Sequence, residues 1–154
     1  MDEYMESNRA LWDKWTPIHE RSEMYDLQGF KQGGVRLHEF EREEVGDVSG
    51  KTLLHLQCHF GIDTLSWARA GARVTGADFS GEAVAAARAL AAETGIEARF
   101  VQSDLYALPD ALDERFHVFE RQERCETDAH GDAGVAHGRG RLPAPFQRRR
   151  LWHA

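Results

Sequence analysis

The sequence is poor in the features that mark secreted, disulfide-stabilised or membrane-spanning proteins. It has two cysteines and four prolines in 154 residues. No apolar run is close to the length of about 20 residues that a membrane-spanning helix needs. Its N-terminus has neither the basic start nor the apolar core of a secretory signal. The two cysteines, Cys58 and Cys125, lie in segments of different character, so we expect free thiols rather than a disulfide. These absences predict a cytoplasmic protein that makes no use of a membrane.

The chain has fewer basic than acidic residues, and its charge is unevenly distributed along the sequence. The net charge of -7 and the pI of about 5.6 argue against a nucleic-acid partner, which would require a basic surface. From Glu120 onward, however, seven arginines outnumber five acidic residues, so the negative charge belongs to residues 1–119. The chain therefore changes character near residue 120.

Between residues 51 and 119 apolar segments alternate with helical ones, and the hydrophobic content of 42% is enough for a core. The pattern predicts strands at 52–57, 73–77, 97–102 and 115–119, helices at 63–70 and 80–93, and one helical turn near Pro109. Alternation of this kind is typical of an α/β, Rossmann-like parallel sheet flanked by helices.

The segments on either side of this region differ from it. Residues 1–50 predict a cap of two or three short helices, with a break at Pro17. Its aromatic residues Trp12, Trp15 and Tyr25 either pack the helices onto the sheet, which we favour, or cover a ligand as a lid. Residues 120–154 show neither helical nor strand periodicity, and we expect a disordered, irregular tail.

A loop follows the first predicted strand and opens the next helix, from Gln57 to Gly61. Backbone N–H groups at such a helix start can face an anionic or polar ligand. An ordinary strand-to-helix turn explains the pattern equally well. A dinucleotide fingerprint needs three spaced glycines, and the loop has only Gly61, so pyrophosphate binding is disfavoured.

Two acidic residues follow the second and third predicted strands. Asp78 can accept the hydroxyls of a ribose while Phe79 offers its face to a flat base, or it can serve as a loop aspartate or helix cap. Asp104 can hold an exocyclic amine or be a turn residue. The carboxyl ends of parallel strands meet at one edge, so the sequence predicts that both acids lie there.

His55, Cys58 and His59 lie close together in the sequence, but they do not predict a metal site. A strand histidine and a turn histidine need not converge, and no second pair with zinc spacing is present. Cys58 lacks the partners of an activated nucleophile. We therefore expect no metal and name no catalytic residue.

With these residues in view, the chain resembles the class I S-adenosylmethionine-dependent methyltransferases. The resemblance covers about residues 8–119 and is carried by the segment L-H-L-Q-C-H-F-G-x-D-T-L-S-W-A-R at Leu54–Arg69. It implies S-adenosylmethionine as cofactor and a small-molecule methyl acceptor. The implied cofactor contacts are Gln57, Cys58, His59 and Gly61 near the methionine part, Asp78 with Phe79 at the ribose, and Asp104 with Leu105 at the adenine.

The sequence also departs from that family. The loop keeps one glycine and lacks the usual preceding acid, and four strands are recognisable where the family has seven. We hypothesise that the gene is truncated, or its reading frame altered, near Phe119. The alternatives to a methyltransferase are a non-catalytic remnant or interaction module and, less favoured, a nicotinamide-dependent oxidoreductase. Sequence does not indicate the oligomeric state.

Overall fold

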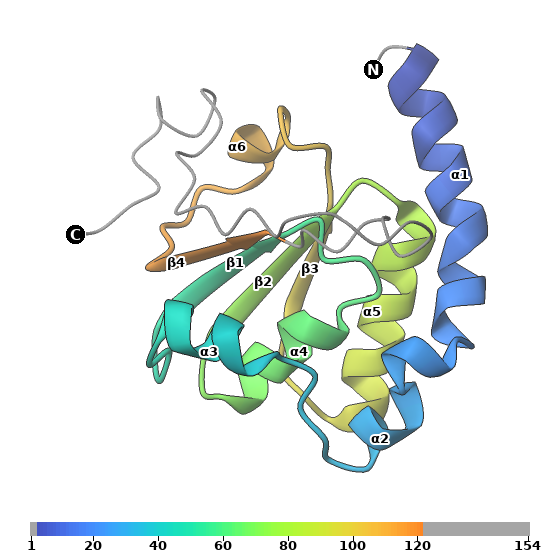
Figure 1. Cartoon of the computed structure of the whole chain (residues 1–154). Helices are drawn as coiled ribbons and strands as arrows, with labels where there is room; N and C mark the ends of the chain where they lie inside the picture. Colours follow the sequence, from blue (N-terminus) through green and yellow to red (C-terminus); the bar gives the residue numbers. More distant parts are fainter. Residues whose placement is uncertain (1–2, 122–154) are drawn as a thin grey trace.

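The computed structural model describes residues 3–121 (Figure 1). Its helices are α1 (Glu3–Glu20), the 3-10 helix η1 (Glu23–Tyr25), α2 (Leu27–Lys31), α3 (Glu39–Val45), α4 (Ile62–Arg69), α5 (Gly81–Thr94) and α6 (Leu108–Ala111). Its strands are β1 (Thr52–Leu56), β2 (Arg73–Asp78), β3 (Arg99–Gln102) and β4 (Val118–Arg121). The expected tail at 120–154 lies outside the described residues apart from the last two positions of β4.

The strands form one parallel sheet in the order β3-β2-β1-β4. This confirms the predicted α/β, Rossmann-like architecture. The predicted strands at 52–57 and 73–77 differ from β1 and β2 by one residue at one end. The predicted starts of the last two strands are too early, because β3 begins at Arg99 and β4 at Val118. Residues 115–117 instead lead into β4, and His117 N–H donates to the Thr52 carbonyl at 2.9 Å.

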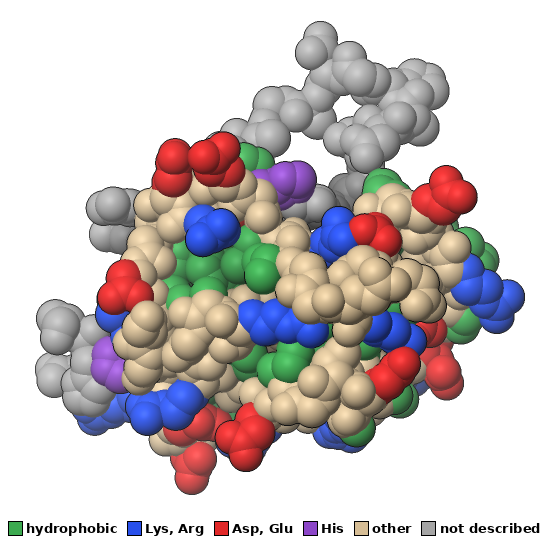
Figure 2. Space-filling model, turned by 90° about the horizontal axis from the view of Figure 1, so that it is seen from below, with side chains coloured by type: hydrophobic (Ala, Val, Ile, Leu, Met, Phe, Trp, Pro, Cys, Tyr) green, Lys and Arg blue, Asp and Glu red, His purple; other side chains and the backbone are tan. Residues whose placement is uncertain are grey.

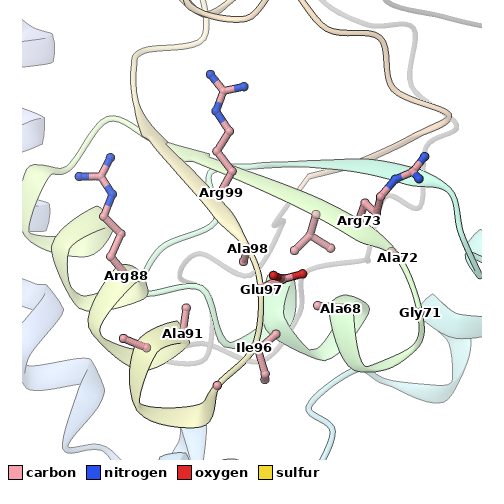
Figure 3. A pocket seen from close by; sticks show the side chains of 13 residues that line it. Ala68, Gly71, Ala72, Arg73, Arg88, Ala91, Ile96, Glu97, Ala98 and Arg99 are labelled. Atoms are coloured by element: carbon pink, nitrogen blue, oxygen red, sulfur yellow. The ribbon is translucent and has the colours of Figure 1, made fainter.

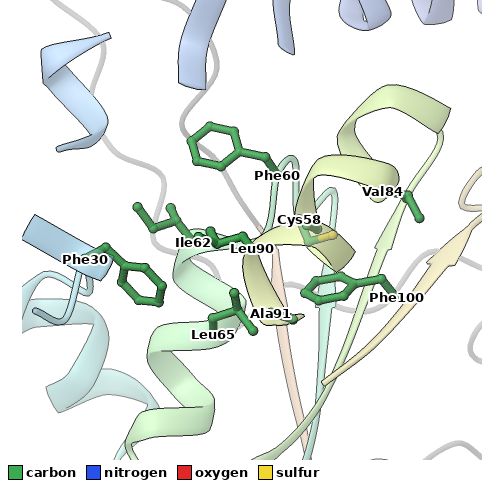
Figure 4. Packing of buried hydrophobic residues seen from close by; sticks show 10 residues of the cluster. Phe30, Cys58, Phe60, Ile62, Leu65, Val84, Leu90, Ala91 and Phe100 are labelled. Atoms are coloured by element: carbon green, nitrogen blue, oxygen red, sulfur yellow. The ribbon is translucent and has the colours of Figure 1, made fainter. Parts of the chain in front are cut away.

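Alternating strand residues pack into clusters of buried side chains on both faces of the sheet. On the face covered by α4 and α5, Phe100 of β3 packs with Leu65, Leu90 and neighbouring buried side chains (Figure 4). On the other face Leu54 and Leu56 of β1 pack with α6, through a cluster that also contains Ala77, Leu108, Leu112 and Phe116. Figure 1 shows this separation of α6 from α4 and α5. Burial on both faces explains why the strands read as nearly continuous apolar runs.

Helix α5 has the ends that its sequence predicts. Ser80 is the N-cap, and its hydroxyl oxygen accepts from Ala83 N–H at 3.1 Å. Gly95 ends the helix in the left-handed conformation, where its N–H bonds back to the last turn. The N-terminus of α5 is thereby fixed at the carboxyl end of β2.

Helix α1 corrects the prediction of a break at Pro17. The helix is continuous over 18 residues with Pro17 inside it. A proline removes one N–H donor from the helix ladder, and such a loss is tolerated where tertiary contacts hold the helix in place. Thr16, one residue earlier, is buried, and its hydroxyl donates to the Trp12 carbonyl at 3.0 Å. Packing of α1 against the domain thus overrides the local signal. Within residues 3–121, no helix is both long and apolar enough to cross a membrane.

The packing of Gly76 in β2 gives the first testable prediction. A Cβ at this position would lie 2.7 Å from the Phe100 ring and 2.9 Å from Cys58 Sγ. Both neighbours are buried in the core and have no room to move. Gly76→Ala should therefore lower the free energy of unfolding by about 1–3 kcal/mol, measured by urea denaturation.

The matched control for this variant is Gly81→Ala. There the added Cβ meets only the end of the Gln102 side chain, at 3.2 Å or more, and Gln102 is exposed. This variant should unfold at nearly the wild-type urea concentration. Equal stability of the two variants would contradict the tight packing assigned to Gly76.

Candidate cofactor site at the carboxyl edge of the sheet

The predicted site residues meet at one edge of the sheet, where β1, β2 and β3 end. Cys58 N–H donates to the Ala77 carbonyl at 3.0 Å, which joins the loop after β1 to the end of β2. Ser103 N–H donates to the Asp78 carbonyl at 2.9 Å, which joins the loop after β3 to the same place. In a parallel α/β sheet this edge is where ligands bind.

The loop after β1 has an unusual backbone. Gln57 and His59 adopt left-handed conformations with φ of 56° and 51°, and Gly61, the N-cap of α4, has φ of 81°. Left-handed backbone is uncommon for residues other than glycine and costs about 1–3 kcal/mol unless the surroundings enforce it. Such strain gathers at functional loops, so the loop is a candidate ligand-binding segment on its geometry alone.

Within this loop, side chains alternate between the core and the edge. Cys58 is a free thiol in the buried core, and burial raises its pKa well above the ordinary value, so it is not an activated nucleophile. Gly61 is required by packing, because a Cβ would lie 2.8 Å from Phe100 and 2.9 Å from Ala87. Neither residue can contact a ligand through a side chain, whereas Gln57 is exposed.

Asp78 connects the parts of this edge. Its Oδ2 accepts from His59 N–H at 2.8 Å, and its Oδ1 accepts from Ser80 N–H at 2.9 Å. The side chain is only 7% exposed. Burial raises the pKa of Asp78, and the backbone donors oppose that rise. Each carboxylate oxygen keeps a further lone pair, so the group can still accept ligand hydroxyls.

The remaining predicted contacts lie at the same edge and are half-buried. Asp104 Oδ1 accepts from the N–H groups of Tyr106 and Ala107, both at 2.8 Å, so this aspartate serves the turn that the sequence also allowed. Phe79 and Leu105 are half-buried on the adjoining loops. The structure therefore brings Asp78, Asp104 and the loop from Gln57 to Gly61 together.

Helix α1 contributes residues that the sequence did not single out. Asp13 Oδ1 accepts from the Ser80 hydroxyl at 2.5 Å and from Glu82 N–H at 3.4 Å, at the start of α5. Asp13 is 67 positions from Ser80 in the sequence, and no local pattern marks such a contact. A carboxylate at this place also complements the positive end of the α5 dipole.

A second contact from α1 reaches the loop itself. His19 Nδ1 lies 2.7 Å from His59 Nε2. The rings of Trp12 and Tyr25 pack around this pair, with centroids 5.6 and 6.0 Å from that of His59. Burial lowers the pKa of His59 to about 4, and the neighbouring His19 adds to the effect. Trp12 and Tyr25 of the cap therefore pack against the loop of the candidate site, which is compatible with both roles that the sequence left open.

The third histidine considered as a ligand is directed elsewhere. His55 in β1 is buried and its Nδ1 lies 2.7 Å from Thr64 Oγ1 of α4. Burial lowers the pKa of His55 to about 3, so the ring is neutral. Among residues 3–121, no group of three or more His, Cys, Asp or Glu side chains is placed to hold a metal ion.

A separate hollow lies at the opposite edge of the sheet. Its volume is about 980 Å³, and its lining comes from the ends of α4 and α5 and the starts of β2 and β3. Figure 3 shows Arg73, Arg88 and Arg99 around small apolar side chains, and the view from below in Figure 2 shows basic side chains beside apolar surface. Arg88 donates to the Phe100 carbonyl at 2.6 Å and Arg99 pairs with Glu114. The hollow lies away from the predicted contacts.

Comparison with known proteins agrees with this geometry. Residues 53–123 match the family model of the methyltransferase domain. The resemblance to class I S-adenosylmethionine-dependent methyltransferases is confirmed. The ubiquinone biosynthesis O-methyltransferase of Shewanella pealeana is 31% identical over 121 residues, which are 79% of this chain and 48% of the relative. The ubiquinone biosynthesis O-methyltransferase of Vibrio cholerae is 34% identical over 110 residues, which are 68% of this chain and 44% of the relative. The chain thus spans about half the length of these curated relatives.

Two solved structures share the fold of this chain. TehB from Haemophilus influenzae superposes with a TM-score of 0.51 at 18% identity, over 63% of this chain and 33% of that one. The 16S rRNA methyltransferase RsmC of T. Thermophilus, in complex with AdoMet and guanosine, superposes with a TM-score of 0.51 at 25% identity. The match covers 62% of this chain and 28% of that one. The matched part of this chain therefore corresponds to about a third or less of each of these larger chains.

The buried neutral histidines predict an acid-sensitive domain. In the unfolded chain an imidazole has a pKa of about 6.5, whereas folding lowers the pKa of His59 to about 4 and that of His55 to about 3. Between these values the unfolded state binds more protons, so stability is lost as the pH falls through this range. Each of the two histidines should lower the free energy of unfolding by about 2 kcal/mol when the pH falls from about 7.5 to 5.

Urea unfolding at these two pH values measures the loss. His59→Phe removes one of the two titrating rings, so its unfolding free energy should fall by about 2 kcal/mol less than that of the wild type over the same range. An identical pH dependence in the variant would show that His59 is not held neutral by burial.

Proposed function

We propose that this protein uses S-adenosylmethionine to methylate an oxygen atom of a small molecule. The observation that carries the proposal is the edge formed by the strained loop, Asp78 and Asp104 in a segment that matches the methyltransferase domain. The reaction is an in-line displacement at a sulfonium methyl, for which the protein mainly supplies alignment and proximity. We name no general base among the described residues.

The residues at this edge fit the cofactor. A buried carboxylate with unused lone pairs at Asp78 suits the ribose hydroxyls, with Phe79 beside it for the adenine face. Asp104 and Leu105 lie on the next loop, where they would contact the adenine edge. Gln57 and His59 would face the methionine part, while Cys58 and Gly61 act by shaping the loop.

The choice of acceptor rests on the relatives and on charge. The sequence relatives carry the name O-methyltransferase, which supports an oxygen acceptor. One structural relative is an rRNA methyltransferase, so an RNA acceptor is the competing choice. The net charge of -7 opposes RNA, because the phosphate backbone is bound by basic surfaces. We therefore propose a small acceptor rather than a nucleic acid. We also propose that the enzyme is cytoplasmic.

A second candidate function is a binding module that keeps the cofactor edge without turnover. The observation in its favour is that the chain spans about half of the curated relatives. Incubation of the full chain with methyl-labelled S-adenosylmethionine and a panel of small molecules that carry hydroxyl groups separates the two. Label transfer supports the enzyme, and cofactor binding without transfer to any acceptor supports the module.

Cofactor binding by Asp78 is tested by calorimetric titration of S-adenosylhomocysteine into the full chain. Asp78→Asn keeps one oxygen acceptor but loses the charge, so affinity should fall by about 1.5–3 kcal/mol, or roughly ten- to a hundredfold. Asp47→Asn is the matched control, because Asp47 precedes β1 at the other edge of the sheet. Equal affinity of both variants would reject the ribose assignment, and a preference for NAD would reject the cofactor.

A further inference from the structure

One nitrogen at the cofactor edge is buried without a hydrogen-bond partner. Among the described residues, three side-chain nitrogens are buried without a hydrogen-bond partner: Arg36 Nε, Trp67 Nε1 and His59 Nδ1. Of these, only the His59 nitrogen lies on the loop after β1. His59 is 9% exposed, and leaving a buried polar atom unpaired costs about 1–3 kcal/mol. An unpaired atom at this place indicates a site completed by a ligand.

The other nitrogen of the same ring is already bound. His59 Nε2 lies 2.7 Å from His19 Nδ1, so one proton is shared between the two rings. In a neutral imidazole one nitrogen donates and the other accepts. The hydrogen bond from His19 therefore decides whether Nδ1 of His59 is a donor or an acceptor, as second partners do for histidines that bind metals.

The surroundings of the pair hold both rings in place, and burial lowers the pKa of His59. Trp12, Tyr25 and Phe60 pack around His59 with ring centroids between 4.7 and 6.0 Å away. The titratable groups that face the pair are Tyr25 of η1, Asp78 at the end of β2 and, through Asp78, Asp13 of α1. Asp78 accepts the backbone N–H of His59, so the loop backbone is fixed where the imidazole is attached.

We propose that His19 is a positioning residue that fixes the tautomer and orientation of His59, whose Nδ1 makes one hydrogen bond to the amino-acid group of the cofactor. This inference rests on the proposed use of S-adenosylmethionine. A ligand carboxylate is the partner when Nδ1 carries the proton, and a ligand ammonium is the partner when it does not. In both cases, α1 acts on the cofactor through the loop after β1 rather than by touching the ligand.

The test uses the full chain and S-adenosylhomocysteine as the probe. Long-range ¹⁵N–¹H spectra of the histidine rings report the tautomer of His59 directly. Addition of saturating S-adenosylhomocysteine should shift the His59 Nδ1 resonance, whereas the bond to His19 keeps Nε2 in its original state. In His19→Phe the His59 tautomer should no longer be fixed, so a His59 spectrum in that variant identical to that of the wild type would show that His19 acts by packing alone.

Variants of His19 separate the hydrogen bond from the packing. His19→Phe keeps an aromatic ring but removes the nitrogen, and should weaken S-adenosylhomocysteine binding about five- to tenfold. His19→Asn places an amide near the original Nδ1 and should restore affinity to within about twofold of the wild type. Trp15→Phe trims another ring of α1 and should also bind within about twofold, and circular dichroism checks that each variant is folded.

The outcomes distinguish this inference from the function on which it rests. Binding of S-adenosylhomocysteine with an unchanged His59 Nδ1 resonance, and with equal affinity in His19→Phe, would overturn the role of His19 and leave the cofactor assignment intact. No binding to the folded wild type would overturn both. A shifted resonance together with rescue by His19→Asn establishes the positioning role.

Discussion

The bonds made by the Asp78 carboxylate organise the edge of the sheet on which the proposed function depends. One oxygen holds the backbone of the loop after β1 and the other holds the start of α5, so a single side chain fixes two connections relative to β2. The carboxylate is buried, and without those donors it would be costly to leave there. The same group is proposed to bind the ribose. Its structural and ligand-binding roles are compatible because an ionised carboxylate has about four acceptor positions, more than the backbone donors of Ser80, His59 and Phe79 occupy.

Much of the fold could be predicted because its signals are local. The apolar run before Gln57, the alanine-rich segment after Ser80 and the glycine that ends α5 each specify an element within a few residues. Alternation of such elements then predicts the parallel sheet and places Asp78 and Asp104 at one edge. Strand boundaries were less accurate, since β3 and β4 begin where neighbouring strands pair with them, and pairing is not encoded locally.

The parts that sequence could not predict depend on contacts between distant segments. Helix α1 continues through Pro17 because its packing against the domain outweighs the local preference for a break. Asp13 and His19 look like ordinary polar residues of a surface helix, yet they meet Ser80 and His59 at separations of 67 and 40 residues. Nothing within a helical turn of either residue distinguishes it from a solvated side chain. Such roles are visible only once the helix has been placed.

The strained loop and the contacts of α1 have a common physical explanation. Two non-glycine residues in left-handed conformations within five positions make the loop after β1 unfavourable in isolation. The Asp78 bond to His59 N–H, the Cys58 bond to Ala77 and the rings around His59 together enforce this conformation. A loop held in this way loses little further conformational freedom when a ligand binds, so more of the contact energy appears as affinity. The strain is therefore consistent with a preformed binding surface, and α1 is part of what maintains it.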